Sequence, residues 1–320
     1  MMRIPAFVAI LLVSTVLMAG CGKKSPTAPK MNASVDMSVA EARISAVIAQ
    51  QPEVVEDGQF QTSDSSVTLA GVRPLRFWRR ITHVDRTVEF AFSDTDTTGK
   101  PTVAIVTVRK LLSGQFNIVA RVPDSTGTDS TTSLIHKPLA DEWVRRLLFR
   151  RVPHHDFHRG WGDHRDHDGA DDDSTEDWRL VGTSGVQVTS QEAQTRIVSV
   201  RVQAGSVDST ITDPLAFFML RGVLHFNHDD QVTLTVTTLR NDDVVFLLLT
   251  RHRIFFKNNG DNTYTATLPM PREECVFSLR HIGVNALSHG TLFDGQAPYD
   301  SQAWIAPFAV RPFEMAAYLY

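Results

Sequence analysis

The chain has 320 residues, with 32 Lys and Arg against 36 Asp and Glu, and a formal net charge of −4. This mild acidic balance, without a basic cluster large enough for a DNA- or RNA-binding face, excludes nucleic acid as an expected partner. The length is sufficient for two domains with full hydrophobic cores. Of the two cysteines, only Cys275 lies beyond the first 21 residues, so we expect no internal disulfide and assign the stability of the protein to packing.

The N-terminus has the pattern of an export signal. Arg3 precedes an uncharged apolar stretch, Ala6 to Gly20, which is too short to span a bilayer comfortably. The stretch ends in LMAGC, Leu17 to Cys21, which resembles the lipobox of bacterial lipoproteins. Met18 stands where that pattern usually has leucine. The resemblance implies that residues 1–20 are removed as a signal peptide and that Cys21 is acylated; the alternative is an ordinary signal peptide followed by an unrelated cysteine.

Acylation would make the lipid bilayer a partner of the chain. Each buried methylene contributes about 0.8 kcal/mol, so several acyl chains on Cys21 would hold a folded body stably at a membrane. Gly22 follows the cysteine, and the absence of aspartate there resembles the sorting pattern of outer-membrane lipoproteins in organisms with two membranes. Residues 21–35, with Pro26 and Pro29, are expected to form a linker, in which Gly22 to Ala33 span roughly 35 Å at about 3.1 Å per residue.

Residues 36–204 are expected to form an α+β domain with an antiparallel sheet. A helix is predicted from Ser38, because Ser38 and Glu41 have capping-box spacing, and Pro52 ends it. Strands are predicted in the stretches beginning at Arg86, Thr102, Phe116, Val144, Trp178 and Arg196. Gly114 lies between the second and third of these stretches and is expected at a hairpin turn.

Residues 205–312 are expected to form a second, all-β domain, because short strands alternate there with turns rich in Asn, Asp and Gly. The stretch KNNGDNTYTATLPMP resembles bacterial immunoglobulin-like modules, in which a polar turn precedes a Y-x-A-x-L strand. The resemblance implies an immunoglobulin-like β-sandwich with Tyr264, Ala266 and Leu268 directed into or along its core. Residues 313–320 are expected to be a short C-terminal tail, and the predicted fold class is therefore mainly β.

An insertion rich in histidine and aspartate, residues 154–177, interrupts the first domain at an expected hairpin tip. From His154 to Trp178 the chain has eight Asp and one Glu against two Arg, a formal charge of −7. One interpretation is a hydrated loop that this charge keeps from collapsing. The other is weak binding of zinc or copper, for which imidazole is a suitable ligand. The candidate ligands are His154, His155, His158, His164, His167, Asp163, Asp166 and Asp168. Beyond that metal, no cofactor is expected.

Common catalytic signatures are missing from the sequence: it has no G-x-S-x-G, H-E-x-x-H, Walker loop or G-x-G-x-x-G. Ser288 and His289, with Asp294 nearby, are interpreted as polar loop residues rather than a catalytic set. We therefore expect a non-catalytic, membrane-anchored envelope lipoprotein that acts as a binding or assembly module, with an envelope protein as partner. The alternative is a metal-binding or metal-buffering envelope protein, and a hydrolase with dispersed catalytic residues is a third hypothesis.

Overall fold

The computed structural model describes residues 33–50, 73–123, 130–153, 176–219, 223–227, 229–249, 252–270 and 279–311. Strands dominate these residues, and almost all neighbouring strands are antiparallel. The prediction of a mainly β chain with antiparallel sheets is confirmed.

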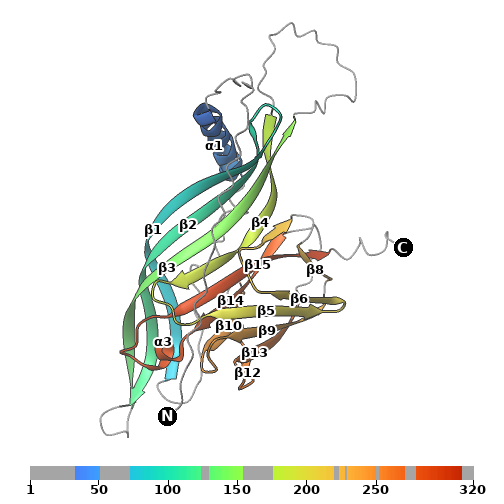
Figure 1. Ribbon diagram of the computed structural model, residues 1–320. Helices are drawn as coiled ribbons and strands as arrows, with labels where there is room; N and C mark the ends of the chain where they lie inside the picture. The colour runs from blue at the N-terminus through green and yellow to red at the C-terminus, as the bar shows by residue number, and fades with distance from the viewer. Residues whose placement is uncertain are drawn as a thin grey trace, which may run out of the picture.

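The strands form two sheets (Figure 1). The larger has ten strands, eight of them in the following order. They are β1 (Arg73–Thr95), β2 (Pro101–Pro123), β3 (Ser130–Pro153), β4 (Glu176–Ser190), β15 (Ser301–Arg311), β14 (Leu279–Leu287), β10 (Val244–Leu249) and β11 (His252–Phe255). Two short strands join its side: β7 (Phe217–Met219) pairs with β4, and β8 (Leu224–Asn227) pairs with β15.

The smaller sheet has five strands. Their order is β12 (Lys257–Asn258), β13 (Thr263–Pro269), β9 (Gln231–Thr238), β5 (Ile197–Ala204) and β6 (Val207–Ile211). Two helices complete the described structure, α1 (Ala33–Gln50) and α3 (His289–Phe293). None of the helices in the described part of the chain is both long and apolar enough to cross a membrane.

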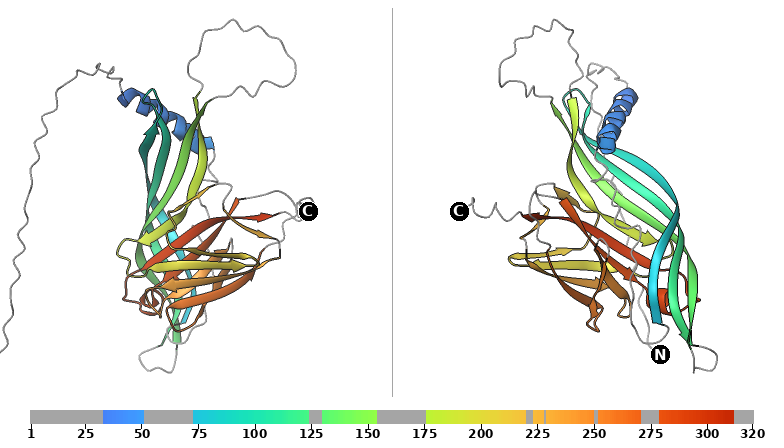
Figure 2. Two further views of the ribbon diagram at one scale, coloured as in Figure 1. Left: turned by 45° about the vertical axis from the view of Figure 1, so that its right-hand side comes forward. Right: turned by 180° about the vertical axis from the view of Figure 1, so that it is seen from behind.

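The first three strands of the larger sheet are unusually long, and with β4 they form a curved, twisted ribbon (Figures 1 and 2). Alternation along β2 explains which face is covered: Ala104, Val106 and Val108 are fully buried, whereas the residues between them are partly exposed. Successive strand residues point to opposite faces, so this pattern assigns one face of the ribbon to the core.

Helix α1 lies against the upper end of that inner face (Figures 1 and 2). Ala40, Ile44 and Ile48 recur at helical spacing and are buried in the same core cluster as the long strands. The predicted helix is confirmed, and it begins at Ala33, before the expected capping residue.

The larger sheet curls until its two ends meet. Phe77 of β1 packs edge-on against Phe246 of β10, with ring centroids 5.7 Å apart. Arg253 of β11 donates a hydrogen bond of 2.9 Å to the carbonyl oxygen of Phe77, and its guanidinium lies 3.9 Å from the centre of the Phe77 ring. The first core is therefore enclosed by strands from both ends of the sheet.

A second core lies between the smaller sheet and the outer side of β10, β14 and β15. Val245, Val284 and Trp304 of the larger sheet belong to one buried cluster with Val200 and Leu234 of the smaller sheet. Figure 2 shows the smaller sheet as a layer beside these strands. Tyr264, Ala266 and Leu268 are buried in this cluster, at 1%, 7% and 2% exposure.

The sheets do not divide between residues 204 and 205, where we expected two domains to meet. Strand β4 precedes that point and pairs with β15, which follows it, while β5 precedes it and pairs with β9 of the smaller sheet. The two cores therefore both draw on residues from each side of the expected boundary.

The expected hairpin at Gly114 is wrong. Residues Pro101–Pro123 form one continuous strand, and Gly114 pairs with Ile81 beside a bulge in β1. A Cβ atom on Gly114 would lie 2.0 Å from the carbonyl oxygen of Arg80, so the glycine permits a close approach of two strands rather than a turn.

Candidate functional site

The histidine- and aspartate-rich candidates lie outside the described residues. All eight expected metal ligands fall within residues 154–175, and Cys21 also lies outside the described chain. The flanks are described: Pro153 at the end of β3 pairs directly with Glu176 at the start of β4. The insertion therefore joins two paired antiparallel strands, as expected for a hairpin tip. Within the described residues, no group of three or more His, Cys, Asp or Glu side chains could hold a metal ion.

Ser288 and His289 have local structural positions. Ser288 is the N-cap of α3, and its hydroxyl accepts a hydrogen bond of 3.1 Å from the backbone N–H of Thr291. His289 is exposed, and its ring lies 4.4 Å from that of Phe293 within the same short helix. The two side chains do not form a pair, consistent with their interpretation as polar residues of a connection.

The arginines of β3 separate between the two faces of the sheet. Arg145 is fully buried and donates a hydrogen bond of 3.1 Å from Nε to the hydroxyl of Thr183. Arg146 and Arg150 are exposed on the opposite face. Arg151 forms an ion pair with Asp96 at the β1–β2 turn. The strand predicted from Val144 is present as part of β3, and Arg146 and Arg150 make its outer face basic.

A polar cluster lies inside the first core. Arg79 of β1 donates from Nε to the hydroxyl of Tyr299 at 2.8 Å and from Nη2 to Ser301 Oγ at 2.9 Å. Asp141 of β3 lies 3.5 Å from Arg79 and accepts a hydrogen bond of 3.1 Å from Tyr299. Asn285 accepts a further bond from Ser301. These five side chains come from four strands and the segment before β15, so they fix how those elements meet.

Burial changes the acid–base properties of this cluster. It raises the pKa of Asp141, and the Arg79 guanidinium and the Tyr299 hydroxyl offset part of that change. Burial also raises the pKa of Tyr299, so the phenol keeps its proton and donates a hydrogen bond to Asp141. Among the described residues, no group hydrogen-bonds to Asp141 Oδ1 or Asn285 Nδ2.

Lys137 of β3 performs a similar structural task at the far end of the core. Its ammonium group donates to the carbonyl oxygens of Gly290, within α3, at 3.0 Å and of Asp294, the C-cap of α3, at 2.6 Å. Burial lowers the pKa of Lys137 to about 8, although the charge of Asp294 acts in the opposite direction. A cation at the carbonyl end of a helix is favoured by the helix dipole.

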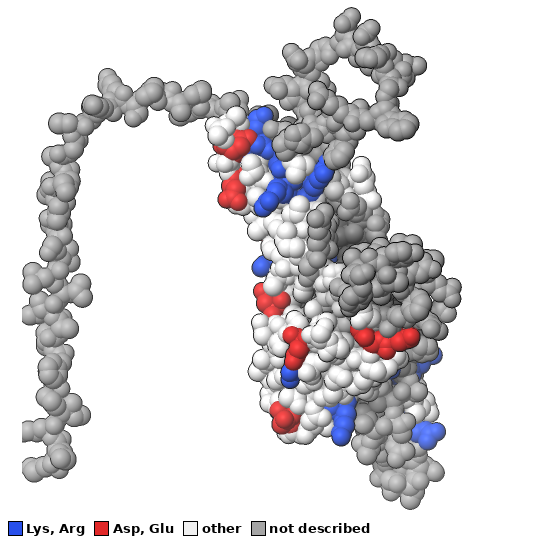
Figure 3. Space-filling view, turned by 90° about the vertical axis from the view of Figure 1, so that its right-hand side faces the viewer, with Lys and Arg blue, Asp and Glu red and all other residues white. Residues whose placement is uncertain are grey.

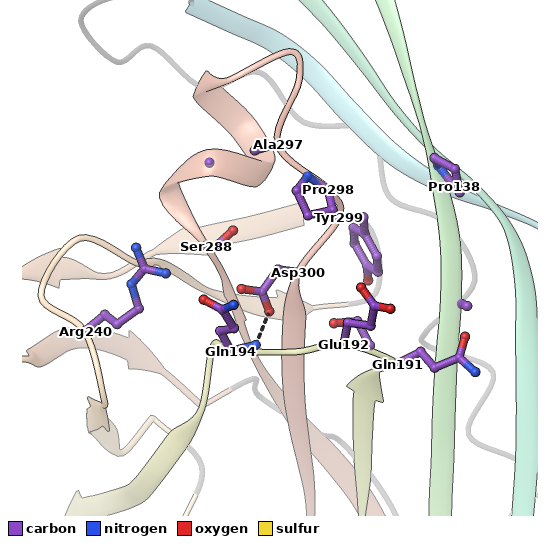
Figure 4. A pocket seen from close by; sticks show the side chains of 13 residues that line it. Pro138, Gln191, Glu192, Gln194, Arg240, Ser288, Ala297, Pro298, Tyr299 and Asp300 are labelled. Carbon is purple, nitrogen blue, oxygen red and sulfur yellow. Dashed lines mark hydrogen bonds between the residues drawn. The ribbon is translucent and has the colours of Figure 1, made fainter.

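Outside this core, a hollow of about 530 Å³ lies between β3, the β4–β5 connection and the segment after α3 (Figure 4). Pro138 and Pro298 form apolar parts of its wall, and Gln191, Gln194 and Arg240 contribute polar groups. Figure 4 shows the side chains of Arg240, Gln194 and Asp300 arranged around one end of the hollow.

A second hollow of about 580 Å³ adjoins the first. The two share Ala140, Ser190 and Gln191 in their walls. The second hollow extends across the outer side of β1 and β2, where His83 and Leu111 line it. We call the two hollows together the groove. Its shape is elongated, and its lining mixes acidic, basic, amide and aliphatic side chains.

One wall of the groove is fixed by a buried carboxylate. Asp300 accepts hydrogen bonds of 3.1 Å from the backbone N–H groups of Gln194 and Thr195 and from the Thr195 hydroxyl. The same hydroxyl lies 3.4 Å from Asp243. Burial raises the pKa of Asp243 to about 6, although Thr238 and Arg240 act to lower it. These hydrogen bonds hold the β4–β5 connection in one position.

Sequence reasoning did not find the groove or the polar cluster. Their residues come from segments more than 200 positions apart, as Arg79 and Ser301 illustrate. The one available signal was the presence of charged residues at inward positions of alternating strands, such as Asp141 and Arg79. Chemically, the groove offers hydrogen bonding and charge on a rigid frame, and these properties suit recognition of an extended polar ligand.

Comparison with protein families, with curated proteins and with solved structures found no match to this chain.

Proposed function

We propose that the protein is a non-catalytic envelope lipoprotein that binds an extended segment of an envelope partner in the groove. The observation that carries this proposal is the adjoining pair of hollows with a preformed polar lining. A ligand that enters a preformed site does not have to order it, so less of the binding free energy is spent on conformational entropy. The lack of catalytic motifs in the sequence and the lipobox-like LMAGC support the remaining parts of the proposal.

Photo-crosslinking in living cells tests groove binding. A photoreactive amino acid at Gln191 should give a discrete adduct with one envelope protein, because Gln191 lines both hollows. Adding Ala140→Trp, which fills the groove, should abolish that adduct. Leu134→Trp is the matched control, because Leu134 is a half-exposed residue of the same strand that does not line the groove. If Ala140→Trp leaves the adduct unchanged, the groove is not the binding site.

The anchor is tested separately by cell fractionation. With Cys21 acylated, the protein should sediment with membranes and carry the mass of the attached chains. Cys21→Ser should leave an unprocessed precursor that carries no lipid. If neither the natural chain nor the variant carries acyl groups, the proposed lipid anchor is wrong. The proposal of groove binding is unaffected by that result.

The proposal also includes the division of the chain into two structural units. We propose that most of residues 205–312 build an immunoglobulin-like sandwich, to which β5 from residues 36–204 also contributes, and that the rest of residues 36–204 build an α+β unit, to which β14 and β15 contribute. Two facing layers around Trp304 support the first idea, and α1 packed on the long strands supports the second.

Metal binding by residues 154–177 is the alternative function. It is supported by the sequence, which has five histidines between Pro153 and Glu176, the paired end residues of β3 and β4. Calorimetric titration with zinc and with copper should give a stoichiometry that falls when the five histidines are replaced by asparagine. Equal stoichiometry in both proteins would eliminate this function.

A further inference from the structure

The outer face of β3 and β4 carries an arginine pair near the upper end of the long strands. Arg150 and Arg179 are direct cross-strand partners, so their side chains lie next to each other on the same face. Arg146 is on the same face of β3, because the pairing of β3 with β2 is regular through this stretch. All three side chains are exposed. We call these three arginines the arginine patch.

Like charges directly opposite each other destabilise a sheet unless an anion lies between them. Two nearby arginines do have such partners: Arg109 of β2 forms an ion pair with Glu142, and Arg151, which follows Arg150 in β3, forms one with Asp96. Within the described chain, no carboxylate forms an ion pair with any member of the arginine patch. The patch therefore has the charge and geometry of a site for an external anion.

Aliphatic side chains complete this surface. Val103 is the cross-strand partner of Arg150, and Ile105 is the partner of Leu148, which lies between Arg146 and Arg150 on β3. These three side chains are partly exposed on the same face as the arginines. A surface of guanidinium groups interleaved with aliphatic side chains fits the phosphate and glycerol layer of an anionic bilayer.

The position of the patch relative to the tether favours a membrane over a soluble anion. Helix α1 lies at the same end of the long strands as the tip of β3 and β4 (Figures 1 and 2). Figure 3 shows Lys and Arg side chains gathered at the end that carries α1. Helix α1 begins at Ala33, twelve residues after Cys21, and that length of extended chain spans roughly 40 Å. An acyl anchor on Cys21 would hold this end close to the bilayer.

We infer that the arginine patch rests on the anionic headgroups of the membrane to which the protein is anchored and so sets the orientation of the folded body. This inference rests on the lipid anchoring proposed above. The acyl chains on Cys21 would keep the folded body at the membrane without setting which face it presents. A cluster of cations on one face adds attraction to anionic headgroups, so the two together would orient the body.

The test uses residues 22–320, which include every described residue and lack Cys21. Sedimentation with vesicles of equal parts phosphatidylglycerol and phosphatidylcholine should show binding that raised salt weakens, and pure phosphatidylcholine should show none. Replacing Arg146, Arg150 and Arg179 together by glutamine should reduce the partition constant about 100-fold, since each arginine near an anionic surface contributes about fivefold.

The matched control removes the same charge elsewhere. Arg80→Gln, Arg121→Gln and Lys257→Gln replace three exposed residues distant from the patch, and this variant should bind as the natural chain does. Equal losses in the two triple variants would mean that only net charge matters, and the inference would fail. The inference would also fail if the natural chain did not bind the vesicles and a variant with Asp171, Asp172 and Asp173 replaced by asparagine did. That result would mean that the acidic residues of the chain itself, and not lipid headgroups, neutralise the arginine patch.

This measurement is independent of the anchor. If Cys21 carries no lipid, the anchoring proposal fails while patch-dependent vesicle binding still stands. If Cys21 is acylated and the vesicles bind both triple variants alike, anchoring stands and the orientation by arginines is wrong.

Discussion

Charged residues buried inside the protein help to select one arrangement of its strands. Arg79, Asp141 and Tyr299 are buried together, and each satisfies hydrogen-bonding groups of the others. A buried ion pair contributes little net stability compared with apolar residues of the same size, but removal of one partner is costly. We expect this cluster to select one arrangement of β1, β3 and β15 among the alternatives that apolar packing alone would permit.

Asp243 provides a pH test at the residue scale. Its pKa in the folded protein is raised to about 6 from an ordinary 3.8, so the folded state takes up a proton at a higher pH than the unfolded state. This group therefore makes the protein more stable as the pH falls from about 7 to 4, and that contribution is lost as the pH rises through 6.

Asp243→Asn should remove this dependence. At pH 7 the variant should be more stable than the natural protein by about 1–3 kcal/mol, because no buried charge remains, and the difference should vanish near pH 4. Urea unfolding of both proteins at pH 7, 5.5 and 4 measures the difference and cancels the titration of all other groups. A difference that does not change with pH would contradict the assigned pKa.

At the scale of the element, a single glycine decides the shape of the long ribbon. Gly114 lets β2 pass close to the backbone of Arg80 where β1 has its bulge. Bulges bend a strand and increase its twist. This local feature allows β1 and β2 to continue as single strands of 23 residues each.

Gly114→Ala should therefore destabilise the protein by at least about 2 kcal/mol, because the new methyl group forces β1 and β2 apart. Gly295→Ala is the control: its added Cβ would lie 3.8 Å from the nearest side-chain atom, an ordinary contact, and should change stability by less than about 0.5 kcal/mol. Thermal unfolding of both variants measures the effect. Equal melting temperatures would show that the two strands can separate at Gly114 without cost.

The elements illustrate what the sequence can and cannot predict. Alternation located the strands from Arg86, Trp178 and later stretches, because the period of two reports which face is buried. It could not exclude a turn at Gly114, since a glycine in a turn and a glycine in a close approach look alike in sequence. It also could not reveal the bulge between Ile197 and Ser199, which leaves Val198 43% exposed although the nearby Val200 is buried.

The candidate site was less predictable than the elements. The groove forms because Ala140 of β3 and Gln191 of the β4–β5 connection lie near Pro298, which precedes β15. Such contacts follow from strand order, and no local pattern encodes strand order.

At the scale of the whole molecule, closure of the larger sheet joins distant parts of the chain. Phe77 packs on Phe246, and Arg253 covers the Phe77 ring. Phe77→Ala should cost about 3–5 kcal/mol and should loosen β10 and β11 as well as β1. Phe308→Ala should instead loosen β8 and the smaller sheet, because Phe308 packs on Phe226 in the second core.

Hydrogen exchange measured by mass spectrometry distinguishes the two variants. For Phe77→Ala, faster exchange confined to β1 would mean that the ends of the sheet do not support each other. Faster exchange in β10 and β11 as well would confirm the closure, since these segments lie about 170 positions away in the sequence.

The position of β15 has a consequence for biogenesis. The last described strand in the chain is an interior strand of the larger sheet, with β4 on one side and β14 on the other. Until residues 301–311 have emerged, β4 and β14 each retain an open edge, and such edges are ready templates for aggregation. A nascent copy therefore needs protection by a chaperone through almost its entire synthesis, and premature termination upstream of Ser301 should yield insoluble material rather than a smaller folded protein.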